Sequence, residues 1–431
     1  MAVGGRRPRR VGYAVSRASA ADGTGGEGRL MPATERSITT ADAIEHIRSH
    51  ALSTDDDGRV GAEVEWVVVD PSDRLARTPV ATVASLASSA ARTRVTFEPG
   101  GQLELSSDPG GLTAVCDALS SDEEVVARRL QSAGLTMIGI GLDPIRADRR
   151  VVFGPRYDAM ERYFDADGPE GRRMMCGTAS IQVNVDAGGP AVRDRRWRRA
   201  RGERRVGESR NEHRADRVGA PTGWRSTRLA NWWAMDRSRT APPPMSDDAA
   251  GTWASYALAA NVMMIGDGER FDAPEIRFPF RDWIERGYAG LYPTIADLDY
   301  HVTTLFPPVR ARGWLEIRYL DAQEAPWWRA AVAVTVALMN DAQAAGVAEQ
   351  VCAPLAGRWM EAARDGLSSP GFAAAARACF DAVTAALPRL EADDVTAEAV
   401  RRFVDTFVAR GRCPADALME RPATSPALVA R

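Results

Sequence analysis

Residues 61–69 read Gly61-Ala62-Glu63-Val64-Glu65-Trp66-Val67-Val68-Val69. Side chains alternate between the two faces of a β-strand, so a strand here places Glu63 and Glu65 on one face and Val64 and Trp66 on the other. Neighbouring carboxylates repel each other unless a cation lies between them. This stretch therefore predicts a strand with an apolar face for the core and an acidic face for chemistry.

Three further stretches show the same alternation. Their polar faces carry Gln102, Glu104 and Ser106 within residues 97–106, Gln182 and Asn184 within 180–186, and Glu316 and Arg318 within 313–321. A solvated sheet face is the commonest reason for such alternation. These faces, however, carry mainly carboxylate and amide oxygens, which suit magnesium or manganese. We expect an α+β fold in which an antiparallel sheet forms a metal-lined trough, backed by helices on its apolar side.

Helical patterns surround these strands. Helices are expected at about 39–52, 112–132, 327–346, 349–365, 370–387 and 394–410. Residues 1–35 are rich in Gly and Arg and are expected to be disordered. Residues 36–345 are then expected to form the catalytic domain, and residues 346–431 a helical C-terminal part of the same domain.

Composition narrows the chemistry. The chain has 431 residues, a formal net charge of -3 and 55 basic residues, all of them arginine. Walker-type phosphate loops, protein kinases, Schiff bases and pyridoxal enzymes each need a lysine and are excluded. The longest apolar run, residues 330–339, is about half of the ~20 residues that span a bilayer. We expect no membrane segment and a cytoplasmic location.

Six blocks, taken together and in order, carry a family resemblance. They are Gly61 to Glu65, Phe97 to Ser106, Met174 to Asp186, Pro221 to Ser226, Asp297 to Phe306 and Leu315 to Arg318. The chain resembles the plant-type glutamate-cysteine ligases, and most of all the actinobacterial branch associated with ergothioneine biosynthesis. The resemblance implies a glutamine-synthetase-like catalytic fold that uses ATP and Mg²⁺.

The same resemblance implies roles for individual residues. It implies a set of metal ligands made up of Glu63, Glu65, Glu104 and Glu316, with Glu98 and Gln182 completing the coordination. Arg318 would hold the transferring phosphoryl group, which a guanidinium fork can do without lysine. Glu316 and Arg318 are therefore the expected catalytic residues.

Further residues are expected to bind the nucleotide and the substrate. Asn184 and Gln182 are candidates for contact with the nucleotide or its metal. Arg225, Arg156 and Tyr157 are candidates for the carboxylates of the substrate. For Arg156 and Tyr157, a plain surface loop is an equal alternative.

The resemblance implies a glutamate-cysteine ligase, an enzyme that couples glutamate, cysteine and ATP. ATP would phosphorylate the γ-carboxylate of glutamate, and the amine of cysteine would displace the phosphate to give γ-glutamylcysteine. Two alternatives stay open: a related carboxylate-amine ligase with another amine acceptor, and an impaired homologue whose arginine-rich arm binds RNA. No feature identifies a pocket for the cysteine thiol, and none indicates the oligomeric state.

Residues 193–217 break the family pattern. They contain eleven arginines against five carboxylates, with few apolar residues. A core-facing helix is not expected here, because the stretch lacks an apolar stripe. The interpretations are a disordered loop, a locally shifted reading frame or an RNA-binding arm, and we expect the segment to be mobile and open to trypsin. Nucleic-acid binding is the less favoured of these.

Overall fold

The computed structural model describes residues 36–52, 58–190, 192–202, 222–266 and 269–420. By its contacts the chain divides into two units, Met1–Arg36 and Ser37–Arg431. The expected disordered segment 1–35 lies outside the described residues. All helices and strands of the described residues lie in the second unit.

A seven-stranded antiparallel sheet organises this unit. The strands are β1 (Val60–Val69), β2 (Thr93–Phe97), β3 (Leu103–Ser107), β4 (Thr136–Ile138), β5 (Ser180–Asp186), β8 (Val309–Ala311) and β9 (Trp314–Asp321). Their order is β2-β3-β1-β5-β9-β8, and β4 pairs with β1. A small hairpin, β6 (Ile265–Gly266) with β7 (Phe271–Asp272), lies apart from this sheet. The antiparallel sheet and the α+β class are as expected.

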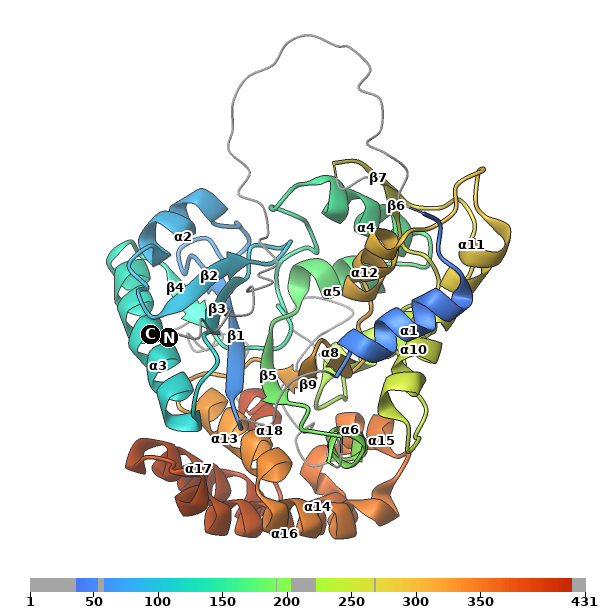
Figure 1. Cartoon of the computed structure of the whole chain (residues 1–431). Helices are drawn as coiled ribbons and strands as arrows, with labels where there is room; N and C mark the ends of the chain where they lie inside the picture. Colours follow the sequence, from blue (N-terminus) through green and yellow to red (C-terminus); the bar gives the residue numbers. More distant parts are fainter. Residues whose placement is uncertain (1–35, 53–57, 191, 203–221, 267–268, 421–431) are drawn as a thin grey trace, which may run out of the picture. The chain divides into compact units, whose positions relative to one another are not determined.

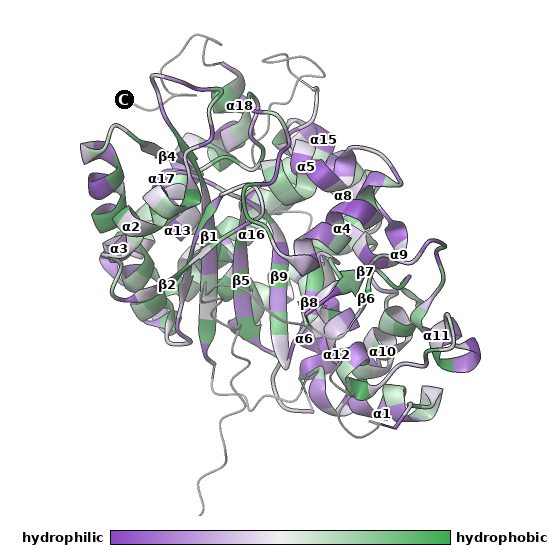
Figure 2. Cartoon of the chain, turned by 90° about the horizontal axis from the view of Figure 1, so that it is seen from above, coloured by the Kyte–Doolittle hydropathy of each residue, from purple (hydrophilic) through white to green (hydrophobic). Residues whose placement is uncertain are grey.

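The register places the predicted polar residues opposite one another. Glu65 pairs with Glu104, Glu63 with Gln182, and Asn184 with Glu316. Directly opposite residues point to the same face of a sheet. Figure 2 shows the hydrophilic and hydrophobic residues alternating along β1, β5 and β9.

Helices fill the sequence between and after the strands. Up to β8 they are α1 (Thr40–His50), α2 (Val80–Ala87), α3 (Leu112–Ser132), α4 (Pro155–Asp165), α5 (Glu170–Gly177), α6 (Arg193–Gly202), α8 (Thr227–Ala234), α9 (Arg237–Thr240), α10 (Ala249–Ala259), α11 (Phe280–Arg286) and α12 (Ile295–Thr303). After β9 they are α13 (Trp327–Asn340), α14 (Ala342–Cys352), α15 (Trp359–Asp365), α16 (Pro370–Ala386), α17 (Asp394–Thr406) and α18 (Pro414–Met419).

The apolar face of the sheet packs against the C-terminal helices. Val64, Leu105, Val183 and Ile317 are fully buried in one core cluster with the side chains of α13. Figure 1 shows α13 beside the sheet, with α14, α16 and α17 beyond it. The predicted backing of the sheet by helices and the helical C-terminal part are therefore present.

A single helix expected at 327–346 is in fact two. Asp341 ends α13 and caps α14, because its carboxylate accepts from the peptide N–H groups of Gln343 and Ala344. Among the described residues, no single helix has the length and apolar character to cross a bilayer. The pair 327–340 and 342–355 reaches that length and composition together, but it is bent by 93°.

The expectation that no core-facing helix forms at 193–217 is wrong for residues 193–202, which form α6. Trp197 and Ala200, three residues apart on one helix face, are both fully buried. The Trp197 ring packs edge-on against Trp253, with ring centres 6.2 Å apart. The buried Arg199 donates to the Met339 carbonyl at 2.9 Å and pairs with Glu349 at 3.0 Å.

The number of apolar residues alone does not reveal α6. One buried tryptophan, one alanine and a paired arginine stem supply enough contact to dock a short helix. Residues 203–217 lie outside the described residues.

Candidate functional site

Three carboxylates gather on the polar face of the sheet. Glu65 comes from β1, Glu104 from β3, and Glu98 from the turn between β2 and β3. Each offers one oxygen, and the three oxygens lie within 4.8 Å of one another. Glu63 points to the same face from β1, two residues from Glu65. The structure thus brings together three of the five predicted carboxylate ligands and places a fourth, Glu63, on the same face.

Burial and mutual repulsion make these carboxylates reluctant to ionise. Burial raises the pKa of Glu65 and of Glu104, and the neighbouring charge of Glu65 adds to the rise at Glu104. Burial, with the charges of Glu65 and Glu104, raises the pKa of Glu98 well above its usual range. Burial raises the pKa of Glu63 to about 7, helped by Glu104 and Glu316. A bound cation relieves such repulsion, and carboxylate oxygens are the donors that Mg²⁺ prefers.

Hydrogen bonds hold these carboxylates in place. The Glu65 carboxylate accepts from the Ser180 peptide N–H at 2.9 Å and from the Ser180 hydroxyl at 2.8 Å. Glu104 accepts from the hydroxyls of Thr96 (2.5 Å) and Ser106 (3.0 Å). Ser180 and Thr96 belong to neighbouring strands and Ser106 to the same strand as Glu104, so the sheet itself fixes the direction of each carboxylate.

The turn that carries Glu98 depends on close backbone packing. A side-chain carbon on Gly100 would lie 2.0 Å from the Cys176 carbonyl oxygen, so only glycine fits. Arg77 donates to the carbonyls of Gly100 (2.6 Å), Ala147 (2.8 Å) and Cys176 (3.2 Å). Sequence reasoning missed Arg77, because nothing in the local pattern links residue 77 to residue 100.

Glu316 differs from the other predicted ligands. Its Oε2 accepts from Arg310 Nε at 2.5 Å and from Arg318 at 3.0 Å, while its Oε1 accepts from Arg310 Nη2 at 3.0 Å and from Arg312 at 3.1 Å. Although burial opposes ionisation, the charges of Arg310, Arg318 and Arg312 hold the Glu316 pKa well below its usual range. Both oxygens are therefore engaged by guanidinium groups, which does not support the expected role of Glu316 as a metal ligand.

Arg318, the other predicted catalytic residue, lies between Glu316 and the carboxylates of β1 and β3. It donates to Glu316 and also to the side-chain carbonyl of Gln182. Its Nε is buried and has no hydrogen-bond partner among the described residues. A guanidinium with an unused donor beside a carboxylate cluster is suited to binding an anion such as a phosphoryl group.

Gln182 and Asn184 connect the strands rather than standing free. The Gln182 amide donates to Glu65 at 3.2 Å. The Asn184 amide donates to Glu63 at 3.3 Å and accepts from the Trp314 indole N–H at 3.0 Å. Their expected contact with nucleotide or metal stays a prediction.

The predicted substrate residues fall in two places. Tyr157, half-buried on α4, has its pKa raised to about 12 by burial and by the negative charges of Glu98 and Glu104. Arg156 donates to the Thr303 hydroxyl at 3.0 Å and to its carbonyl at 3.2 Å, and lies over the ring of Tyr300. The structure thus supports a place for Tyr157 near the acidic face.

Arg225 is placed differently from the expectation. Its guanidinium pairs with Asp416 of α18 at 2.7 Å, and its peptide N–H donates to the Ala363 carbonyl at 2.9 Å. It therefore ties the start of α8 to the C-terminal helices. This arrangement gives no support to a role in binding substrate carboxylates.

A buried ion pair that the sequence analysis missed lies at the far end of the face. Arg228 of α8 pairs with Asp321 at 3.2 Å, and both are almost fully buried. Arg228 also donates to the Arg318 carbonyl at 2.8 Å, and its charge opposes the rise in the Glu65 pKa. The pair anchors α8 to the end of β9.

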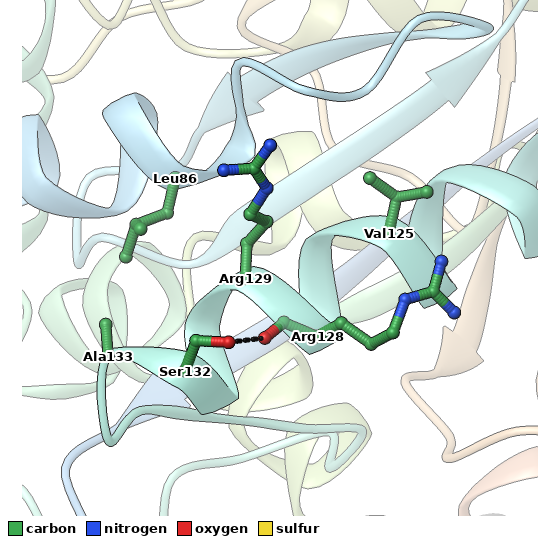
Figure 3. A pocket seen from close by; sticks show the side chains of 6 residues that line it. All are labelled: Leu86, Val125, Arg128, Arg129, Ser132 and Ala133. Atoms are coloured by element: carbon green, nitrogen blue, oxygen red, sulfur yellow. Dashed lines mark hydrogen bonds between the residues drawn. The ribbon is translucent and has the colours of Figure 1, made fainter.

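The surface hollow between α2 and α3 has a different character (Figure 3). It is lined by Leu86, Val125, Arg128, Arg129, Ser132 and Ala133. Arg128 pairs with Glu124 of its own helix, and the Ser132 hydroxyl donates to the Arg128 carbonyl. The hollow has no carboxylate among its lining residues, so the candidate site remains the polar face of the sheet.

Comparison with known proteins adds to this geometry. The sequence model of glutamate-cysteine ligase family 2 matches residues 59–203 and 217–429. Glutamate-cysteine ligase EgtA of Mycobacterium tuberculosis is 38% identical over 395 residues, which cover 88% of this chain and 89% of the relative. The chloroplastic glutamate-cysteine ligase of Medicago truncatula is 29% identical over 245 residues, which cover 54% of this chain and 47% of the relative.

Among solved structures, a glutamate-cysteine ligase of Francisella tularensis in complex with AMP covers 86% of each chain at 12% identity. Its TM-score of 0.41 is too low to equate the two folds. The family match includes α6 and stops at residue 203, then resumes at residue 217. The departure from the family pattern is thus narrower than residues 193–217.

Proposed function

The chain belongs to glutamate-cysteine ligase family 2, and from this membership we propose that it is an ATP-dependent ligase that joins the γ-carboxylate of glutamate to the amine of cysteine. The product is γ-glutamylcysteine, made for ergothioneine biosynthesis. A cytoplasmic location remains a prediction.

The observation that carries the proposal is the division of one sheet face into two charged halves. Carboxylates of β1, β3 and the β2–β3 turn form the acidic half, and three arginines around Glu316 form the basic half. Transfer of a phosphoryl group needs cations around the phosphate oxygens and a hydrogen-bond donor to the phosphoryl group as it is transferred. The two halves supply both on one sheet, with β5 between them.

The chemistry follows from charge. A carboxylate is a poor electrophile, so a γ-carboxylate oxygen of glutamate attacks the γ-phosphorus of ATP, and the bond to ADP breaks. The cysteine amine then attacks the acyl carbon of γ-glutamyl phosphate, inorganic phosphate leaves, and the amine loses a proton. No covalent bond to the enzyme is required.

Individual side chains have distinct tasks in this proposal. Glu65, Glu98 and Glu104, with Glu63 beside them, would hold Mg²⁺, because their oxygens approach one another and their pKa values are raised. Bound Mg²⁺ would neutralise phosphate oxygens during the transfer. Arg318 binds the moving phosphoryl group. Tyr157 and Arg156 of α4 contact glutamate, since the charges of Glu98 and Glu104 act on Tyr157.

The test is the formation of ADP by the purified chain with glutamate, ATP and Mg²⁺, with and without cysteine, together with the mass of the product. We expect ADP and γ-glutamylcysteine in equal amounts when cysteine is present. Full activity with another amine and none with cysteine would identify a related carboxylate-amine ligase. Glu65→Gln is the matched variant, because it keeps the shape and removes the charge; near-normal activity at low Mg²⁺ would remove the metal assignment.

A further inference from the structure

Arg310 of β8 is held on every side. Its fork grips both oxygens of Glu316, with Nε at 2.5 Å from Oε2 and Nη2 at 3.0 Å from Oε1. Its Nη1 donates to the Leu305 carbonyl at 3.2 Å, and the side chain is 8% exposed. Every nitrogen of this guanidinium thus has a partner, so neither the arginine nor the carboxylate can rotate without breaking bonds.

The grip on Glu316 determines where its other donors lie. The Oε2 atom receives Arg318, and the Oε1 atom receives Arg312. Because the fork fixes the plane of the carboxylate, it fixes the points from which Arg318 and Arg312 donate. Arg318 continues the chain to Gln182, and Gln182 continues it to Glu65. The orientation of Arg318 therefore depends on a residue of β8, which β9 and β5 separate from the strands of the acidic half.

A second contact joins Arg310 to α12, the helix whose last residue also binds Arg156. Its Nη1 is 3.4 Å from the Thr303 carbonyl, the same oxygen to which Arg156 donates at 3.2 Å. Thr303 ends α12, so one carbonyl connects the helix that carries Arg156 with the strand that carries Arg310.

We propose that Arg310 is a positioning residue for phosphoryl transfer: it touches no substrate, and it sets Glu316 so that Arg318 meets the γ-phosphate of the nucleotide. This inference rests on the proposed function. It predicts that loss of Arg310 removes the recognition of the γ-phosphate while the rest of the nucleotide still binds.

The test compares the dissociation constants of ADP and of AMPPNP, a non-hydrolysable ATP analogue, by titration calorimetry at saturating Mg²⁺. The parent chain is expected to bind AMPPNP at least about tenfold more tightly than ADP, the factor that one charge-assisted hydrogen bond of ~1.5 kcal/mol supplies. In Arg310→Met the ratio falls towards one, while the affinity for ADP stays within about threefold, and Arg318→Met behaves in the same way.

Arg329→Met is the matched control. Arg329 is also buried, with 5% of its side chain exposed, and it also pairs with carboxylates, Asp117 and Asp393, but it lies on α13 and joins that helix to α3 and to the start of α17. This variant is expected to lose stability as Arg310→Met does and to keep the parent's ratio. An equal fall in both variants would show a merely structural role and overturn the proposal.

Arg310→Lys serves if Arg310→Met fails to fold, because lysine keeps the charge but cannot hold both carboxylate oxygens. A folded Arg310→Lys with the parent's ratio would overturn the proposal, as would a parent ratio near one. The proposed function is judged separately by γ-glutamylcysteine formation in the parent. A chain that prefers AMPPNP but makes no γ-glutamylcysteine would overturn the proposed function and leave the positioning role standing.

Discussion

At the scale of single residues, the two charged halves behave as opposites. The acidic half contains carboxylates whose pKa values are raised, and the basic half contains Glu316, whose pKa is held low by three arginines. Perturbed groups side by side are typical of sites that handle charge. The acidic half needs a cation and the basic half carries an excess of positive charge, which together match a metal-bound polyphosphate.

Arg318→Lys should separate phosphoryl transfer from substrate binding. A single nitrogen of Arg318, Nη1, donates to both Glu316 and Gln182. Lysine keeps the positive charge but has only one nitrogen, so it has no second, rigidly placed donor for a phosphoryl group. We expect kcat to fall on the order of 100-fold, with a much smaller change in KM for glutamate. Steady-state kinetics measure both, and a change confined to the KM for glutamate would place Arg318 in substrate binding instead.

The alternation of polar and apolar residues made half of this site predictable. A period of two places Glu63, Glu65, Glu104 and Gln182 on one face, whatever the order of the strands. Partners far apart in the chain were not predictable: Arg225 meets Asp416 almost two hundred residues later, and no local pattern announces it. Arg310 precedes Glu316 by six residues, but β8 has only three residues and carries no readable alternation.

At the scale of elements, the turn between β2 and β3 is the point where fold and site depend on the same residue. The turn carries Glu98 to the acidic half. The close contact of Gly100 with Cys176 sets the distance between this turn and α5. Gly111 lies in open space, so a closely packed glycine and an unpacked one can be compared directly.

Gly100→Ala should weaken the binding of divalent cations. The new carbon would lie 2.0 Å from a backbone oxygen, so the turn must shift and carry Glu98 with it. Gly111→Ala is the control, because nothing lies within 4 Å of the added carbon and its φ of -73° suits alanine. Mn²⁺ binding to the nucleotide-free protein should weaken at least about tenfold in the first variant only. Equal affinities in the two variants would mean that the turn does not position a ligand.

Helix α6 shows how an arginine-rich stretch can belong to a core. Trp197→Ala should cost about 3–5 kcal/mol of unfolding free energy, since the ring is fully buried against Trp253. Arg195→Ala, at an exposed position of the same helix, should change it by less than about 0.5 kcal/mol. Urea unfolding measures both, and trypsin should cut after Arg196 and Arg199 more readily in the tryptophan variant. A Trp197→Ala chain as stable as the parent would mean that α6 is not docked.

At the scale of the whole molecule, the helices and the polar face of the sheet affect stability in opposite directions. Helix α13 covers the apolar face, and α14, α16 and α17 pack behind it. The polar face contains groups that cost stability when no ligand balances their charge. Functional sites often lower the free energy of unfolding in this way. The loss can be measured, because a ligand that binds only the folded chain raises the free energy of unfolding again.

The stability lost at the buried carboxylates of the polar face predicts how the free energy of unfolding depends on pH and Mg²⁺. The pKa of Glu63 is about 7 in the folded chain against 4.5 for the free side chain, so the folded state binds this proton more tightly than the unfolded state. The stabilisation from proton binding is complete below about pH 4.5 and is lost as the pH rises through about 7. In the metal-free protein, unfolding free energy should therefore fall between pH 5 and pH 8, and this fall should be shallower in Glu63→Gln.

Mg²⁺ competes with protons for the same carboxylates, so it should stabilise the chain more at pH 8 than at pH 5.5. A concentration of 100 times its dissociation constant would return about 2.7 kcal/mol at pH 8. Denaturation in urea at both pH values, with Mg²⁺ or with a chelator, measures the difference. If Mg²⁺ stabilises the parent and Glu63→Gln equally at both pH values, Glu63 does not belong to the cation site, and the division of the face into acidic and basic halves would need another explanation.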